Sequence, residues 1–351
     1  MVRTVNGAWL IRGRDGRLSA YAPRDEAVWC WAQRTPGGSW IAPRTVGGDQ
    51  RLHPVLAVGQ GTDGYAHLVA WRPTGPQEAG LVHTTHFRPH LAALDWNRLG
   101  HPNKAGAQTG VPAVAVDAEG RAHVFVPNAG GGVSMRGQKE RGGWGPWRDL
   151  KGREVEGELA AVTRLSGRVE LYATSPAGIL RWTQAGPGHI PALDDEPLKA
   201  SARPGTLRAL ATSEEHVTVF FTDESDTLCA WRPGTEPVAL LPCAGPGPVS
   251  AIRFTLDGVD CTLLAQRSRS GRAAFAAYPT EQESAGAWWT ESGPQLPPDT
   301  QVSLSKDHQG DLVAATLQPD KGTGGELLMT RRKAEPGLAL EAWRPIVPKN
   351  A

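Results

Sequence analysis

Short apolar or alternating segments recur along the whole chain, and each is followed by a polar turn. Clear cases are residues 55–58, 113–116 and 159–162. Amphipathic segments with apolar positions spaced by about 3.6 residues and a dozen residues long are almost missing from the sequence. Short alternating or continuous apolar segments bounded by turn residues are typical of β-strands. The pattern therefore predicts an all-β protein.

These segments form a repeat. An apolar strand, a polar turn that usually contains Gly, and a second strand occur seven times, with turn positions at residues 16, 64, 120, 167, 215, 258 and 310. The mean step of about 49 residues suits a four-stranded antiparallel blade. We therefore predict a seven-bladed β-propeller that forms a single domain over residues 1–351, with blades at approximately 4–48, 49–104, 105–153, 154–200, 201–245, 246–297 and 298–347. Blades one and seven are expected to close side by side, without exchanging a strand.

Charge and composition exclude several classes of protein. The 37 basic and 36 acidic residues leave a net charge of +1, which disfavours a nucleic-acid partner. Every apolar stretch is much shorter than the roughly 18 residues that span a bilayer, so we expect a soluble chain without membrane insertion. The N-terminal residues carry no apolar signal core, which makes the cytoplasm the default location and leaves non-classical export open. The four cysteines form no C-x-x-C pair, and we expect neither a metal nor a cofactor.

A further pattern joins these features within single blades. Blade three combines the turn 119–121 (Glu-Gly-Arg), Gln138 and the segment 142–147 (Gly-Gly-Trp-Gly-Pro-Trp), and blade one repeats it in part. The combination resembles the seven-bladed bacterial lectins of the Photorhabdus type. The resemblance implies a propeller that binds fucosylated or O-methylated sugars in pockets between adjacent blades.

Aromatic rings beside amide groups are suited to sugars, which present an apolar C–H face and a rim of hydroxyls. Trp31 with Gln33 and Trp182 with Gln184 stand two residues apart on predicted third strands and so share a face. The full set of candidate ligand-binding residues is Trp31, Gln33, His86, Gln138, Trp182, Gln184 and Trp231. A structural alternative stays open, in which the Trp rings pack between blades and the Gln side chains bind the backbone.

Histidine is concentrated in one part of the chain. Seven of the ten His residues lie between positions 53 and 123, and blade two carries an extra loop before Trp96. If the protein is an enzyme, His83, His86, His90 and Asp95 are the candidate acid–base residues. His83 and His86 lie three apart on one strand, so they should face opposite sides unless a bulge intervenes.

Two functions remain. The first is a carbohydrate-binding propeller that recognises a glycan between its blades. The alternative is an enzyme acting on a small or specialised metabolite in the central funnel or under the blade-two insertion. A protein-docking scaffold is a further use of this fold. The expected partner is a glycan or another small-molecule ligand, and the sugar, the number of working pockets and the oligomeric state stay open.

Overall fold

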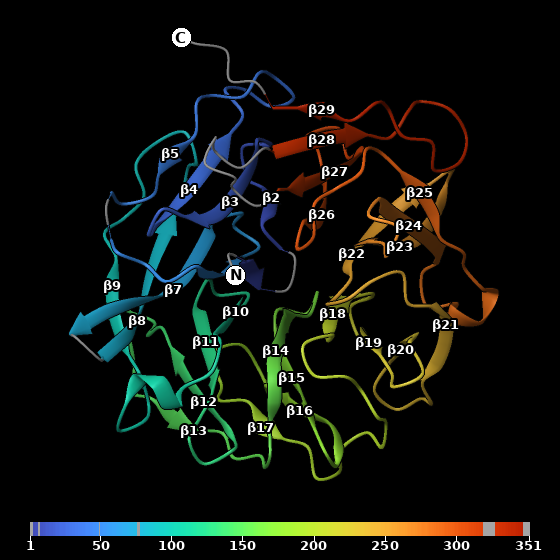
Figure 1. Cartoon of the computed structure of the whole chain (residues 1–351). Helices are drawn as coiled ribbons and strands as arrows, with labels where there is room; N and C mark the ends of the chain where they lie inside the picture. The colour runs from blue at the N-terminus through green and yellow to red at the C-terminus, as the bar shows by residue number, and fades with distance from the viewer. Residues whose placement is uncertain (1–2, 6–7, 49, 76–77, 319–326, 347–351) are drawn as a thin grey trace.

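The computed structural model describes residues 3–5, 8–48, 50–75, 78–318 and 327–346. Seven antiparallel sheets are arranged around a central axis, and blade 1 (blue) lies beside blade 7 (red) in Figure 1. Two short 3-10 helices, η1 (Gly106–Gln108) and η2 (Glu283–Ala285), lie in connections between described strands. The predicted all-β, seven-bladed propeller is confirmed.

In each blade the strands pair in chain order from the inner to the outer edge. Blade 1 consists of β2 (Leu10–Arg12), β3 (Leu18–Arg24), β4 (Ala27–Ala32) and β5 (Arg44–Thr45). Blade 2 contains β6 (Val55–Gln60), β7 (Ala66–Gly75), β8 (Glu78–His86) and β9 (Asn97–Gly100). Blade 3 contains β10 (Ala113–Val116), β11 (Ala122–Pro127), β12 (Val133–Gly137) and β13 (Arg148–Asp149). Blade 4 contains β14 (Glu156–Thr163), β15 (Val169–Ser175), β16 (Gly178–Thr183) and β17 (Ala192–Leu193).

The remaining blades follow the same plan. Blade 5 contains β18 (Arg208–Ala211), β19 (Val217–Thr222), β20 (Thr227–Trp231) and β21 (Val238–Pro242). Blade 6 contains β22 (Ser250–Leu256), β23 (Val259–Arg267), β24 (Ala273–Pro279) and β25 (Thr290–Ser292). Blade 7 contains β26 (Gln301–Lys306), β27 (Leu312–Leu317), β28 (Leu327–Arg331) and β29 (Arg344–Pro345).

The first strand of the chain departs from this plan. β1 (Arg3–Val5) pairs in parallel with β6 on the inner edge of blade 2, which makes that sheet five-stranded and places this strand near the centre of the ring (Figure 1). The expected first blade begins at residue 4, whereas the sheet of blade 1 begins at β2. Blades 1 and 7 each consist of one continuous segment, so they close side by side without strand exchange, as predicted.

The turns between the first two strands explain why the repeat is visible in the sequence. In blade 3 the carboxylate of Asp117 accepts hydrogen bonds from the backbone N–H groups of Glu119 and Arg121, both at 3.0 Å. Gly120 between them has a φ of 74°, a conformation that costs glycine little. Asp307 makes the same turn in blade 7. Each turn is thus specified by residues that lie within a few positions of one another.

Tryptophan side chains join neighbouring blades. In each case the indole N–H of one blade donates to a backbone carbonyl at the outer edge of the preceding blade, and the distances lie near 3 Å. The pairs are Trp96 with Val46 (3.0 Å), Trp147 with Leu99 (3.0 Å), Trp182 with Leu150 (2.8 Å) and Trp289 with Pro242 (2.7 Å). Val46, Leu99 and Leu150 are buried, and a buried carbonyl needs a partner, so at these three seams the indole N–H satisfies the backbone.

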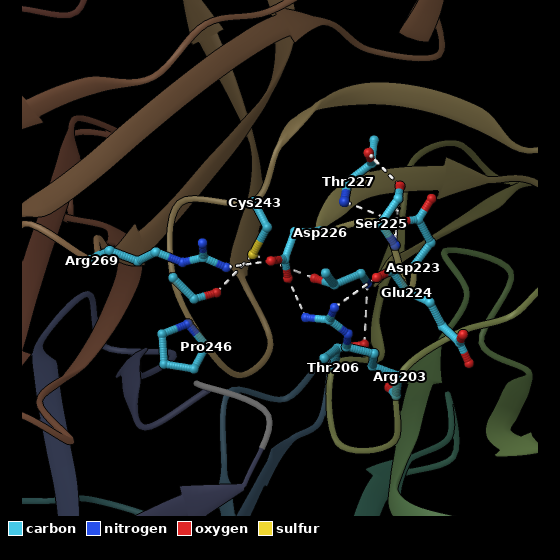
Figure 2. Close-up of polar contacts among 12 residues, drawn as sticks. Arg203, Thr206, Asp223, Glu224, Ser225, Asp226, Thr227, Cys243, Pro246 and Arg269 are labelled. Atoms are coloured by element: carbon cyan, nitrogen blue, oxygen red, sulfur yellow. Dashed lines mark hydrogen bonds and ion pairs between the residues drawn. The ribbon is translucent and has the colours of Figure 1, made fainter.

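Ion pairs link blades 5 and 6. Figure 2 shows the carboxylate of Asp226 between the guanidinium groups of Arg203 and Arg269. Arg203 lies in the segment that leads into blade 5, Asp226 lies in the turn between β19 and β20, and Arg269 extends from the turn between β23 and β24 of blade 6 to bind Asp226 at 2.7 Å. The two arginines lower the pKa of Asp226 through direct hydrogen bonds. This seam is therefore bridged by charged side chains.

Three of the four cysteines, Cys30, Cys229 and Cys261, are buried, and all four are free thiols. Within the described ranges, no helix is long and apolar enough to cross a bilayer.

Candidate functional site

The glutamines selected from the sequence bind the backbone of their own blades. Gln184 is fully buried, and its side chain accepts from Val169 N (2.7 Å) and donates to His189 O (2.7 Å). This connects the first residue of the second strand with the turn that follows the third strand. Gln33 and Gln138 occupy the same place in blades 1 and 3, and they accept from Leu18 N (2.9 Å) and Ala122 N (2.8 Å).

The three tryptophans selected from the sequence are buried. Trp31 exposes 4% of its surface, Trp182 none and Trp231 7%. Trp182 donates across the seam to blade 3, as described above, and Trp231 donates to Thr235 O (3.1 Å) within blade 5. None of these rings lines the pockets described below. The contacts correspond to the structural alternative given for them in the sequence analysis.

The histidines of blade 2 point in different directions. His83 contacts His67, with Nε2 and Nδ1 separated by 3.0 Å, and its ring lies edge-on to Trp144 of blade 3 at 4.9 Å. His86 faces blade 1, where Nδ1 lies 3.0 Å from the hydroxyl of Tyr21. The expectation that His83 and His86 face opposite sides of the strand is confirmed.

His90 and Asp95 do not join either group. His90 contacts the guanidinium of Arg17 of blade 1, with Nε2 at 3.0 Å, and Asp95 is exposed. Among the described residues, no group of three or more His, Cys, Asp or Glu side chains is placed to hold a metal ion. The four candidate acid–base residues are thus not brought together.

His86 does border a small cavity. Pocket 1/2, of about 280 Å³, lies between the outer strands of blade 1 and the blade-two insertion, and its lining includes Arg44, His86 and Leu91. Both ring nitrogens of His86 are engaged, Nδ1 with Tyr21 and Nε2 with Leu91 O at 2.9 Å. Burial lowers the pKa of His86, so its ring is neutral at physiological pH.

A larger cavity lies at the next seam. Pocket 2/3, of about 400 Å³, is formed by His53 before β6, the adjoining ends of β7 and β8 with Trp71 and Glu78, and the segment containing η1 and Thr109 that leads into blade 3. It combines an indole, an imidazole, a carboxylate and a hydroxyl. These are the groups expected for a ligand with one apolar face and several hydroxyls.

Local packing fixes the walls of pocket 2/3. Trp71 exposes 8% of its surface and packs in the hydrophobic cluster between blades 2 and 3, so its position is set by the core. His53 N donates to Trp71 O at 2.8 Å, which holds the lead-in segment against β7. At Gly106 a side chain would meet the carbonyl oxygen of Ala79 at 2.2 Å, so only glycine allows η1 to approach β8 this closely.

A cavity in a comparable position lies at the seam between blades 6 and 7. Pocket 6/7, of about 300 Å³, lies between the segment 246–248, the end of β23 and the segment 299–302 that leads into blade 7. Its lining contains no aromatic ring. Gln266 donates there to Gly247 O (2.7 Å) and accepts from Gly245 N (3.1 Å), so its amide is already bound. The two seam pockets are similar in position and different in chemistry.

None of the pocket 2/3 residues named above, His53, Trp71, Glu78 and Thr109, is among the ligand-binding candidates from the sequence, and Trp71 is the one with a recognisable sequence signal. It ends the apolar part of the second strand of blade 2 and is followed by Arg72 and Pro73. The sequence signal is the break from strand residues to Pro, Thr and Gly directly after a tryptophan, which places the ring at a blade edge.

Several solved structures share this architecture. The BP39L lectin from Burkholderia pseudomallei is 14% identical over 98% of this chain and 100% of its own, with a TM-score of 0.70. AofleA from Arthrobotrys oligospora is 12% identical over 84% of this chain and 87% of its own, with a TM-score of 0.54. The Aleuria aurantia lectin in complex with Fucα1-6GlcNAc is 13% identical over 83% of this chain and 96% of its own, with a TM-score of 0.52. No protein-family model and no curated protein matches the sequence. These likenesses show the fold.

Proposed function

We propose that the protein is a carbohydrate-binding propeller and that pocket 2/3 holds the glycan. The observation that carries the proposal is the presence of Trp71, His53, Glu78 and Thr109 around one cavity of about 400 Å³ between two blades. The indole offers an apolar contact for sugar C–H groups, and the carboxylate and imidazole offer partners for sugar hydroxyls. The hydroxyl of Thr109 accepts from Asn103 Nδ2 at 2.6 Å and can still donate its own O–H. In this proposal the seven blades form a single domain.

Fucosides are the first sugar class to consider. The Photorhabdus-type sequence pattern implies them, and two structural neighbours were solved with fucose-containing ligands, the Aleuria aurantia lectin with Fucα1-6GlcNAc and the SapL1 lectin with α-methyl fucoside. A deoxysugar such as fucose carries a methyl group as well as hydroxyls, which suits a pocket with both an aromatic and an acidic wall.

The alternative of His-based catalysis receives less support. His86 is held by Tyr21 and Leu91, and His90 by Arg17, while His83 lies on the opposite face of β8. An acid–base pair needs two groups near one reacting atom. We retain His86 only as a wall residue of pocket 1/2, where a second ligand would contact it.

Calorimetric titration with α-methyl fucoside, supported by a glycan array, tests the proposal. Glu78→Gln and Thr109→Val should each weaken binding by about tenfold, because each removes a hydrogen-bond partner at the pocket wall. Trp71→Phe should weaken it similarly while keeping an aromatic ring in the core. Trp288→Ala, at a residue that is 76% exposed and outside the pocket, is the control.

The controls separate a pocket effect from a folding effect. All four variants should melt within a few degrees of the wild type, and only the pocket variants should lose affinity. Binding that is unchanged in Glu78→Gln and Thr109→Val would exclude pocket 2/3. No binding to any glycan of the array would exclude the carbohydrate function itself.

A further inference from the structure

A separate cavity lies at the centre of the ring. It measures about 300 Å³ and is lined by residues from the inner strands and lead-in segments of blades 1, 2, 5, 6 and 7, including Arg12, Arg208 and Lys306. It is therefore built by non-neighbouring parts of the sequence and is distinct from the seam pockets. The inner strands β2, β18, β22 and β26, which carry most of these residues, lie around the centre of the ring in Figure 1.

The cavity concentrates positive charge. Three of its lining residues are basic and, among the described residues that line it, none is acidic. Burial lowers the pKa of Arg208 to about 10, and burial together with the nearby Arg12 and Arg253 lowers the pKa of Lys306. Lowered pKa values of cations mean that their charged forms are destabilised where they stand. A bound anion would relieve that cost.

The carboxylates of Asp307 and Asp260, near the cavity, bind arginines outside its wall. Asp307, which directly follows β26, accepts from Arg331 at 2.8 Å, and Asp260 accepts from Arg253 at 2.6 Å. Arg12 donates one of its N–H groups to the carbonyl of Asp307 (2.8 Å) and retains other donors on the same guanidinium. Asp260 partly offsets the lowered pKa of Lys306, but the direct contacts of both carboxylates are with Arg253 and Arg331 and not with Arg12 or Lys306.

The neutral polar groups of the wall are also partly used. Gln60 donates to Arg12 O (2.7 Å) and Gly64 O (3.0 Å), and the hydroxyl of Ser250 accepts from Leu304 N (3.1 Å). The remaining wall is largely aliphatic, with Leu10, Ile11, Val58 and Ile252. Such a wall lowers the local dielectric and strengthens the attraction between the cations and an anion.

We propose that the central cavity is a second ligand site, which binds a small molecule through an oxyanion group, either phosphoryl or carboxylate, held by Arg12, Arg208 and Lys306. Arginine presents a planar fork that matches such a group, and lysine adds a point charge. The volume admits a ligand of monosaccharide-phosphate size. No described residue lines both this cavity and pocket 2/3, so the two sites bind their ligands independently.

Thermal melting of the whole protein with inorganic phosphate, glucose 6-phosphate, citrate and glucose, all at one ionic strength set with sodium chloride, tests the proposal. Phosphate-bearing probes or citrate should raise the melting temperature in a saturable manner, because a ligand that binds only the folded state stabilises it. Glucose should not. The comparison of glucose 6-phosphate with citrate separates a phosphoryl from a carboxylate ligand.

Variants locate the effect. Lys306→Gln should weaken the anion affinity by about tenfold, as expected for the loss of one charge-assisted contact, and should raise the melting temperature of the ligand-free protein by removing a destabilised charge. Arg12→Gln should also weaken binding. Lys104→Gln, at an exposed lysine outside the cavity, should change neither property. The proposal is overturned if no probe stabilises the protein, or if Lys306→Gln retains the full effect.

Discussion

The buried pair His67 and His83 makes acid sensitivity the sharpest test of how blade 2 is packed. The two rings touch through Nδ1 and Nε2 at 3.0 Å, and they expose 3% and 1% of their surfaces. Burial lowers the pKa of His67 to about 4, and burial with the neighbouring imidazole lowers the pKa of His83 to about 3. Both rings are therefore neutral in the folded protein at neutral and mildly acidic pH.

The sign of the effect follows from proton counting. An unfolded chain releases these protons near pH 6.5, so between that pH and the lowered folded values the unfolded state binds more protons than the folded state. The stabilisation is complete above about pH 6.5 and is lost as the pH falls toward 4. Within this window, each histidine lowers the free energy of unfolding by about 1.4 kcal/mol for every unit by which the pH falls. At about pH 5 the loss is roughly 2 kcal/mol for each histidine, or about 4 kcal/mol for the pair.

Urea unfolding followed by tryptophan fluorescence at neutral pH and near pH 5 measures this loss. The double variant His67→Gln/His83→Gln removes both titrating groups, so its free energy of unfolding should fall by about 4 kcal/mol less than that of the wild type over the same pH interval. His53→Gln removes an exposed imidazole instead and should keep the wild-type loss. Ring NMR signals of His67 or His83 that titrate above about pH 5 in the folded protein would refute the reasoning.

Two further substitutions test the seams and the blade core. Trp182→Phe keeps most of the buried ring and removes the N–H that satisfies Leu150 O. Urea unfolding should therefore show a free energy of unfolding that is lower by about 1–3 kcal/mol. A stability equal to the wild type would mean that the indole hydrogen bond does not hold the seam. Glu170→Gln removes the buried carboxylate that the half-buried Arg164 and Arg181 both contact, while Arg181 keeps Asp194. The loss of stability should be about 1–3 kcal/mol with unchanged fucoside affinity, and a stability equal to the wild type would contradict the assigned ion pairs.

The fold could be predicted because its signals are local. The turn that contains Gly120 is specified by Asp117 and the backbone two and four residues away, and Asp307 repeats the arrangement in blade 7. Strand length and turn spacing then give the blade count. The place of β1 could not be predicted, because three residues carry no periodic pattern and their pairing with β6 depends on the ring being closed.

The candidate site was only partly predictable for a related reason. The amide of Gln184 could bind either a sugar or a carbonyl, and the turn that brings His189 O to it decides the matter. The histidines are close together in the sequence, but alternation along β8 turns His83 and His86 to opposite faces. The register of the β7–β8 hairpin brings His83 into contact with His67 instead. Side-chain chemistry is visible in a sequence, but its partner is a property of the fold.

The differences among the seams bear on how many glycans one molecule can hold. Pocket 2/3 has an indole beside donors and acceptors, pocket 6/7 has a committed Gln266 and no aromatic ring, and the seam between blades 5 and 6 is bridged through Asp226 (Figure 2). A multivalent lectin gains avidity from equivalent sites, and these three seams are not equivalent. Under the proposed carbohydrate function, this divergence favours one specialised glycan site at pocket 2/3 over a ring of weak identical ones.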